Sequence, residues 1–127
     1  MSVAVVLALA TAGCSDESPQ STAAGRSAQA FTALLPSNSA AACDLLAPQT
    51  RQELEQSSGS CSRGIADAQL PRAGKVVDVQ VYGLDAMVRM EHDTMFLARF
   101  GKGWRITAAG CRPREQDRPY SCEIKGA

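Results

Sequence analysis

Aromatic residues and net charge are both scarce in this chain. It has one tryptophan, two tyrosines and three phenylalanines among 127 residues, and its 13 basic and 13 acidic side chains cancel. A protein that binds nucleic acid usually carries a basic face or stripe. Here the densest basic stretch, from Arg112 to Arg118, is interrupted by Glu115 and Asp117. The composition therefore predicts no nucleic-acid partner.

The motifs of common catalytic and metal sites are also missing. The sequence has no G-x-S-x-G motif, no glycine-rich phosphate loop between a strand and a helix, and no closely spaced cysteine pair of the zinc-binding type. The single histidine, His92, lies between Glu91 and Asp93 in an expected turn, and three successive turn residues cannot all point at one atom. We expect His92 to be an exposed turn residue. We predict no catalytic residue, no metal ligand and no cofactor.

An apolar run near the start, Val3–Ala10, is too short to cross a bilayer, which takes about 20 residues, but it has the length of a signal-peptide core. The run leads into Thr11-Ala12-Gly13-Cys14 and then into a polar stretch. This pattern resembles the lipobox of bacterial lipoproteins. The resemblance implies cleavage before Cys14, acylation of Cys14, and export to the outer face of the cell membrane, where the lipid anchors the protein. No Lys or Arg precedes the run, and Thr11 stands where the family prefers Leu, so an ordinary secretory signal is the alternative.

The remaining cysteines agree with export. They are Cys43, Cys61, Cys111 and Cys122, an even number, which in a small exported domain is typical of disulfides. Three pairings are possible. We favour Cys43 with Cys61 and Cys111 with Cys122, because each pair closes a short loop within one half of the chain.

Patterns along the chain predict a helical first half. We expect a signal peptide over residues 1–13, a flexible tether over residues 14–26, and one domain over residues 27–127. Ser27 is a candidate N-cap for a first helix that ends at Pro36. Shorter helices are expected over residues 40–46 and 48–56 and around Cys61.

From Lys75 onward, apolar and polar residues alternate with period two, which predicts strands. Four strands joined by short turns and a fifth near Cys122 describe an antiparallel meander whose third strand is central. The expected fold class is α+β, with N-terminal helices packed on a curved antiparallel sheet of four to five strands. The side chains expected to face the interior are Val77, Val79, Val81, Ala86, Val88, Met90, Phe96, Phe100, Trp104 and Ile106.

This order resembles the nuclear-transport-factor-2-like (cystatin-like) superfamily, in particular its small actinobacterial lipoproteins. Phe31, the segment Cys43-Asp44-Leu45-Leu46-Ala47-Pro48 and the run Gly103-Trp104-Arg105-Ile106 carry the likeness over residues 27–125. The resemblance implies a sheet that wraps around the helices to form a cone. Enzymes of the superfamily, such as ketosteroid isomerase and scytalone dehydratase, place Asp, Tyr or His inside that cone.

The expected interior faces are almost entirely apolar, whereas a general acid or base needs a titratable group within reach of the substrate. Asp78, Tyr82, Arg99 and Arg105 supply such groups only if the faces are reversed. We therefore expect a non-catalytic binding or interaction module of the cell envelope, with an unknown protein or an apolar ligand as its partner. The alternative is a small isomerase or lyase with a hydrophobic substrate in the cone.

Overall fold

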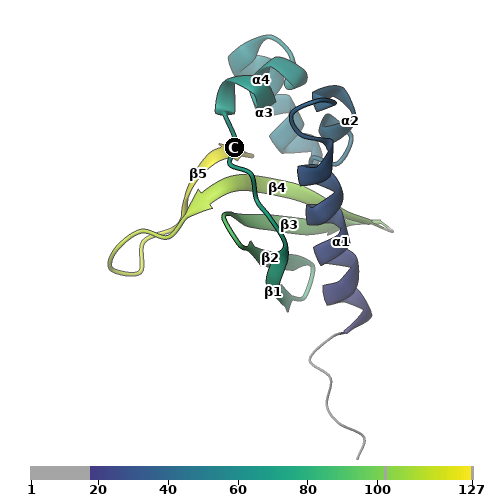
Figure 1. Ribbon diagram of the computed structural model, residues 1–127, viewed down its shortest axis with the longest axis vertical. Coiled ribbons are helices and arrows are strands. Elements are labelled where there is room, and N and C mark those ends of the chain that lie inside the picture. The colour runs from purple at the N-terminus through teal and green to yellow at the C-terminus, as the bar shows by residue number, and fades with distance from the viewer. Residues whose placement is uncertain (1–17, 102, 127) are drawn as a thin grey trace, which may run out of the picture.

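The computed structural model describes residues 18–101 and 103–126, so Cys14 and the signal segment lie outside the described residues. Within these ranges, helices precede strands, as the sequence predicts (Figure 1). The helices are α1 (Pro19–Leu34), α2 (Ser39–Cys43), α3 (Pro48–Ser58) and α4 (Cys61–Ala68). The strands are β1 (Val76–Tyr82), β2 (Asp85–Met90), β3 (Thr94–Phe100), β4 (Gly103–Arg112) and β5 (Ser121–Lys125).

Helix α1 begins earlier than the sequence pattern indicates. Its N-cap is Ser18, whose side-chain oxygen accepts a hydrogen bond from the Ser21 amide at 3.1 Å, and Pro19 occupies the first turn. Proline is well tolerated there because its missing N–H would have no helical partner. The prediction of a tether over residues 14–26 is therefore wrong for residues 19–26, which are helical. The expected cap, Ser27, lies within the helix.

The next three helices follow their capping signals more closely. Asn38 caps α2 through a hydrogen bond from the Ala41 amide. Helix α3 begins at Pro48 and ends at Gly59, whose φ of 87° suits a residue without a Cβ. Helix α2 is shorter than expected because the chain after Asp44 pairs with β4. There the Ala47 amide donates to the Ile106 carbonyl at 2.8 Å.

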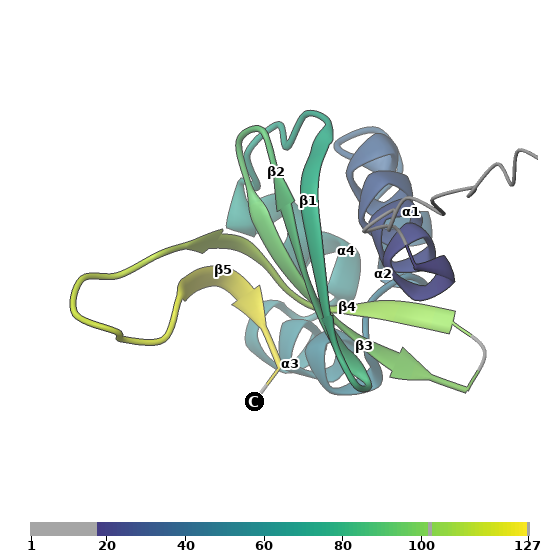
Figure 2. The same ribbon diagram turned by 90° about the horizontal axis from the view of Figure 1, so that it is seen from below.

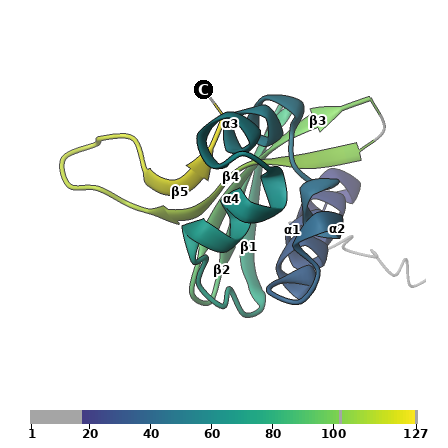
Figure 3. The same ribbon diagram turned by 90° about the horizontal axis from the view of Figure 1, so that it is seen from above.

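The five strands form one antiparallel sheet in the order β1-β2-β3-β4-β5, with β3 at the centre as predicted. The fold is α+β, as expected. Figure 3 looks down on the helical layer and shows α3 and α4 in front of the strands. In Figure 2 the strands lie in front and these two helices lie behind them, so within residues 18–101 and 103–126 both helices cover the same face of the sheet.

The expected interior faces are correct for β2 and for the first half of β4, and wrong for β3. Ala86, Val88 and Met90 are buried, as are Trp104 and Ile106. On β3, however, Met95 and Leu97 face the core, whereas Phe96 is half-buried and Phe100 is exposed. Both faces of β3 carry apolar residues, so alternation alone did not determine which side is buried.

A second correction concerns Val77, on strand β1. It is exposed, because the pairing of β1 with β2 shifts register between Val76 and Asp78. A bulge of this kind adds one residue to a strand and reverses the faces on one side of it. Val76, Val79 and Val81 pack against the core, so the expected face of β1 is correct beyond the bulge.

The space between the helices and the sheet is filled with apolar side chains. The largest of those that are almost fully buried are Phe31, Met95, Leu97, Ile106 and Val88. The disulfides connect neighbouring elements at the margins of this core, and both expected pairings are confirmed. Cys43–Cys61 joins α2 to α4, and Cys111–Cys122 joins β4 to β5.

Candidate functional site

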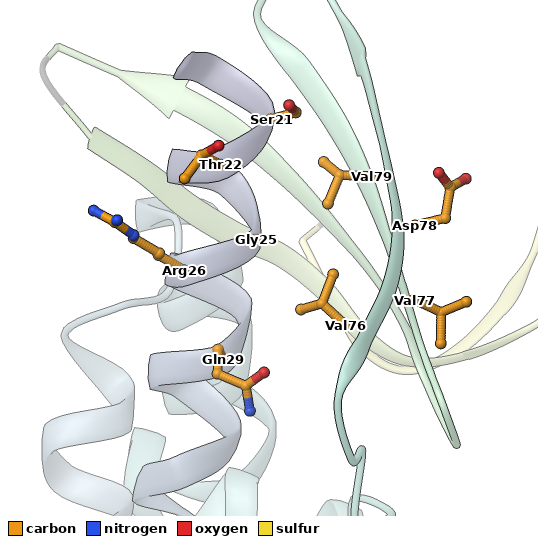
Figure 4. A pocket seen from close by; sticks show the side chains of 9 residues that line it. All are labelled: Ser21, Thr22, Gly25, Arg26, Gln29, Val76, Val77, Asp78 and Val79. Atoms are coloured by element: carbon orange, nitrogen blue, oxygen red, sulfur yellow. The ribbon is translucent and has the colours of Figure 1, made fainter. Parts of the chain in front are cut away.

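A groove of about 540 Å³ lies between α1 and β1 (Figure 4). One wall is helical and mostly polar, and the other is a strand and mostly apolar. The residues that line it are Ser21, Thr22, Gly25, Arg26, Gln29, Val76, Val77, Asp78 and Val79. We call this hollow the α1–β1 groove.

Gly25 sets the closest approach of the two walls. A Cβ built at this position would lie 3.4 Å from Val79 Cγ2, at van der Waals contact, so the helix packs against the strand without a side chain between them. Ser21 lies one turn earlier on the same side of α1, and its hydroxyl donates to the Ser18 carbonyl at 2.9 Å. The groove therefore depends on the first turns of α1, which sequence reasoning assigned to the tether. The Ser18-Pro19 capping pattern is the signal that could have revealed them.

The groove follows the free edge of the sheet. Among the described residues, β1 has β2 on one side and no strand on the other. Figure 4 shows Val76 and Val79 pointing toward α1 while Val77 and Asp78 point away. Since residues of both faces line the groove, it runs along the strand edge rather than over one face. An edge strand presents backbone N–H and C=O groups that a further extended segment can pair with.

Four polar residues would lie inside the fold if the strand faces were reversed, and none of them is part of the buried core. They are Asp78, Tyr82, Arg99 and Arg105. Asp78 lines the groove, and Tyr82 and Arg99 are exposed near the turns that end β1 and β3. The Arg105 guanidinium donates to the Asp44 carbonyl at the edge of β4. The buried core of the described residues contains none of these four side chains.

His92 is exposed in the β2–β3 turn, as predicted. Its neighbour Asp93, which sequence reasoning treated as an ordinary turn residue, is buried. The Asp93 carboxylate accepts hydrogen bonds from three backbone amides, those of Thr94 at 2.7 Å, Cys111 at 3.1 Å and Gly110 at 3.2 Å. The Asp93 side chain thereby holds the β2–β3 turn against the C-terminal end of β4.

Burial raises the pKa of Asp93 above its ordinary value. Its hydrogen bonds from Gly110, Thr94 and Cys111, and the charge of Arg112, act in the opposite direction and are outweighed. His92, Arg112 and Glu123 line a hollow of about 290 Å³ beside it. Because the carboxylate is already occupied by three amides, this cluster is structural in character.

The described ranges, 18–101 and 103–126, contain neither a metal-binding cluster nor a membrane-spanning helix. No group of three or more His, Cys, Asp or Glu side chains there is arranged to hold a metal ion. None of the helices in these ranges is both long and apolar enough to cross a membrane.

No family model, curated protein or solved structure matches this chain. The groove, the core and the cysteines are the features of the molecule that bear on its function. The two disulfides point to an oxidising compartment outside the cytoplasm, since cytosolic thiols are normally kept reduced.

Proposed function

We propose that this protein is a lipoprotein held on the outer face of the cell membrane by acylated Cys14, and that its domain is a non-catalytic interaction module. The sequence Ala12-Gly13-Cys14 after an apolar run supports the anchor. The disulfides support an extracytoplasmic location. A relationship to the nuclear-transport-factor-2-like superfamily is part of this proposal and rests on the sequence resemblance around Phe31, residues 43–48 and residues 103–106.

The observation that carries the interaction role is the α1–β1 groove beside an unpaired sheet edge. An extended peptide segment of a partner protein fits this setting, because it can pair with the backbone of β1 and place alternate side chains against the polar residues of α1 that line the groove. The hydroxyl of Thr22 and the amide of Gln29, both exposed, offer further hydrogen bonds. A purely apolar ligand suits such an open and partly polar lining less well.

The chemistry of the groove favours binding over catalysis. It is lined by neither histidine nor cysteine, and its two ionisable side chains, Arg26 and Asp78, point away from each other (Figure 4). General acid–base catalysis needs such groups to converge on a substrate. The buried carboxylate of Asp93 belongs to a different part of the fold.

Site-specific photo-crosslinking in the native host tests the groove. A photoreactive residue at Thr22 or Gln29 is expected to form a covalent adduct with one defined partner protein. The same residue at Ala23 or Ala30, which are exposed and do not line the groove, is the matched control and is expected to give no such adduct.

Gly25→Leu adds the blocking arm of this experiment. A leucine side chain does not fit between the helix and Val79 unless α1 moves away from β1, so this substitution disrupts the groove and is expected to abolish the adduct. Equal adducts from the groove and control positions, or an adduct that survives Gly25→Leu, would contradict the proposal.

A further inference from the structure

Three large apolar side chains are exposed at the turns of one end of the sheet. Tyr82 and Leu84, at the β1–β2 turn, are 62% and 66% exposed, and Phe100, at the end of β3, is 46% exposed. We call these three residues the apolar rim. A monomeric protein seldom exposes large apolar side chains in a group unless that surface meets another one.

Hydrogen bonds hold the two turns of the rim together. The Arg99 amide donates to the Leu84 carbonyl at 2.8 Å, and Asp85 pairs with Ala98 across β2 and β3. The neighbouring turns therefore lie at the same end of the sheet. Leu84 is exposed there, and Phe100, half-exposed, also lines a hollow of about 340 Å³ beside the start of α3 and the end of β5.

The start of α1 lies at this end as well. The Trp104 indole N–H donates to the Gln20 side chain at 3.0 Å, and Trp104 is paired with Arg99, the residue before Phe100. Figures 1 and 2 both show the beginning of α1 on the same side of the molecule as the β1–β2 and β3–β4 turns, with the β4–β5 hairpin on the opposite side.

The length of chain before α1 restricts what this end can face. Cys14 precedes Ser18, the N-cap of α1, by four positions in the sequence. Four residues span at most about 14 Å even when fully extended. If Cys14 carries acyl chains in the bilayer, the start of α1 must therefore lie close to the lipid headgroups, and the apolar rim lies at the same end.

We propose that the apolar rim rests on the membrane, with Tyr82, Leu84 and Phe100 inserted at the boundary between headgroups and acyl chains. The inference rests on the proposed lipid anchor, which brings this end to the bilayer. Aromatic and leucine side chains favour that boundary region. Arg99 and Asp85 are exposed beside the rim, and the proposed contact is carried by its three apolar side chains.

This placement gives the anchored domain a fixed orientation. The α1–β1 groove runs from the membrane end of the domain along β1, and the β4–β5 hairpin projects from the side away from the rim (Figure 2). The groove thus stays open to partners in the envelope while the rim is covered by lipid.

Vesicle co-sedimentation separates the rim from the anchor. The mature chain from residue 14 onward, carrying Cys14→Ser, has no acyl chain, so any binding to phosphatidylethanolamine–phosphatidylglycerol vesicles comes from the folded domain and its tail. Leu84→Ser combined with Phe100→Ser is expected to lower the vesicle-bound fraction about tenfold, as partial burial of two such side chains implies.

Val77→Ser is the matched control, because Val77 is also an exposed apolar residue but lies near the opposite end of β1. It should bind vesicles as the parent does. Equal vesicle binding by the parent, the double variant and Val77→Ser would overturn the rim contact. So would a double variant that loses a protein partner but still binds vesicles. The lipid anchor is tested separately. An unacylated Cys14 in the host would refute the lipoprotein proposal, whatever the result of the vesicle-binding experiment.

Discussion

Asp93 shows how one buried carboxylate shapes the fold without serving as a catalytic group. Its oxygens accept amide hydrogens from Thr94 on β3 and from Gly110 and Cys111 on β4. Gly110 has a φ of 66°, and a Cβ there would lie 2.8 Å from the Glu123 side chain, so glycine is required where Asp93 binds. The Asp93 carboxylate thus accepts hydrogen bonds from amides of β4 that apolar packing alone would leave without partners.

The raised pKa of Asp93 predicts a particular pH dependence of stability. The folded protein binds the proton more tightly than the unfolded chain, whose pKa is near 3.8. The contribution of Asp93 to stability is therefore fully present below that value and is lost as the pH rises through the raised pKa of the folded state. Asp93→Asn, which does not titrate, removes this dependence.

Urea unfolding of both proteins between about pH 3 and pH 7 measures the effect. We expect the free energy of unfolding of the wild type, relative to Asp93→Asn, to fall as the pH rises. A relative stability that rises with pH would mean that the hydrogen bonds outweigh burial and that the pKa is lowered instead.

The buried side chains of β3 and β4 identify the face of the sheet that packs against the core. Trp104 on β4 is buried and hydrogen-bonded to Gln20, whereas Phe100 on β3 is exposed. We expect Trp104→Ala to lower the free energy of unfolding by about 3–5 kcal/mol, the usual cost of emptying a large aromatic site.

Phe100→Ala and His92→Ala are the matched controls for this prediction. Each is expected to cost less than about 1 kcal/mol, because both side chains are exposed. Denaturant melts of the three variants compare these values. A larger loss from Phe100→Ala than from Trp104→Ala would mean that β3 and β4 present their opposite faces to the helices.

The sequence predicted elements best where a cap or turn residue marks a boundary. Asn38, Pro48 and Gly59 delimit α2 and α3, and glycines or polar clusters separate the strands. The start of α1 was missed because the Ala, Ser and Gly residues after Pro19 have the composition of a linker. Their helical structure depends on packing against β1, which periodicity in a single segment does not reveal.

The faces of strands were less predictable than their existence. The bulge at Val77 and the apolar residues on both sides of β3 leave no local signal for which side is buried, since cross-strand register decides it. The candidate site was missed for the same reason. The α1–β1 groove joins a helix wall assigned to the tether with an edge strand whose register was unknown.

In the molecule as a whole, one end and one flank are available for contacts of different kinds. The apolar rim lies with the start of α1, and the α1–β1 groove lies along the flank of the sheet. Two disulfides fix the elements on the remaining sides, each worth about 3 kcal/mol on a chain-entropy estimate for such short loops. A small domain with little stability to spare is thereby kept rigid where it presents an open strand edge.

Native mass spectrometry of the protein extracted from its own membrane tests the anchored interaction module in one experiment. We predict a chain that begins at Cys14, carries two or three acyl groups and is bound to one polypeptide partner. Gly25→Leu should retain the acyl mass and lose the partner, whereas Gly25→Ala, which adds only a Cβ at van der Waals contact, should retain both. An intact, unmodified N-terminus, or a partner that remains bound to the Gly25→Leu protein, would contradict the proposed function.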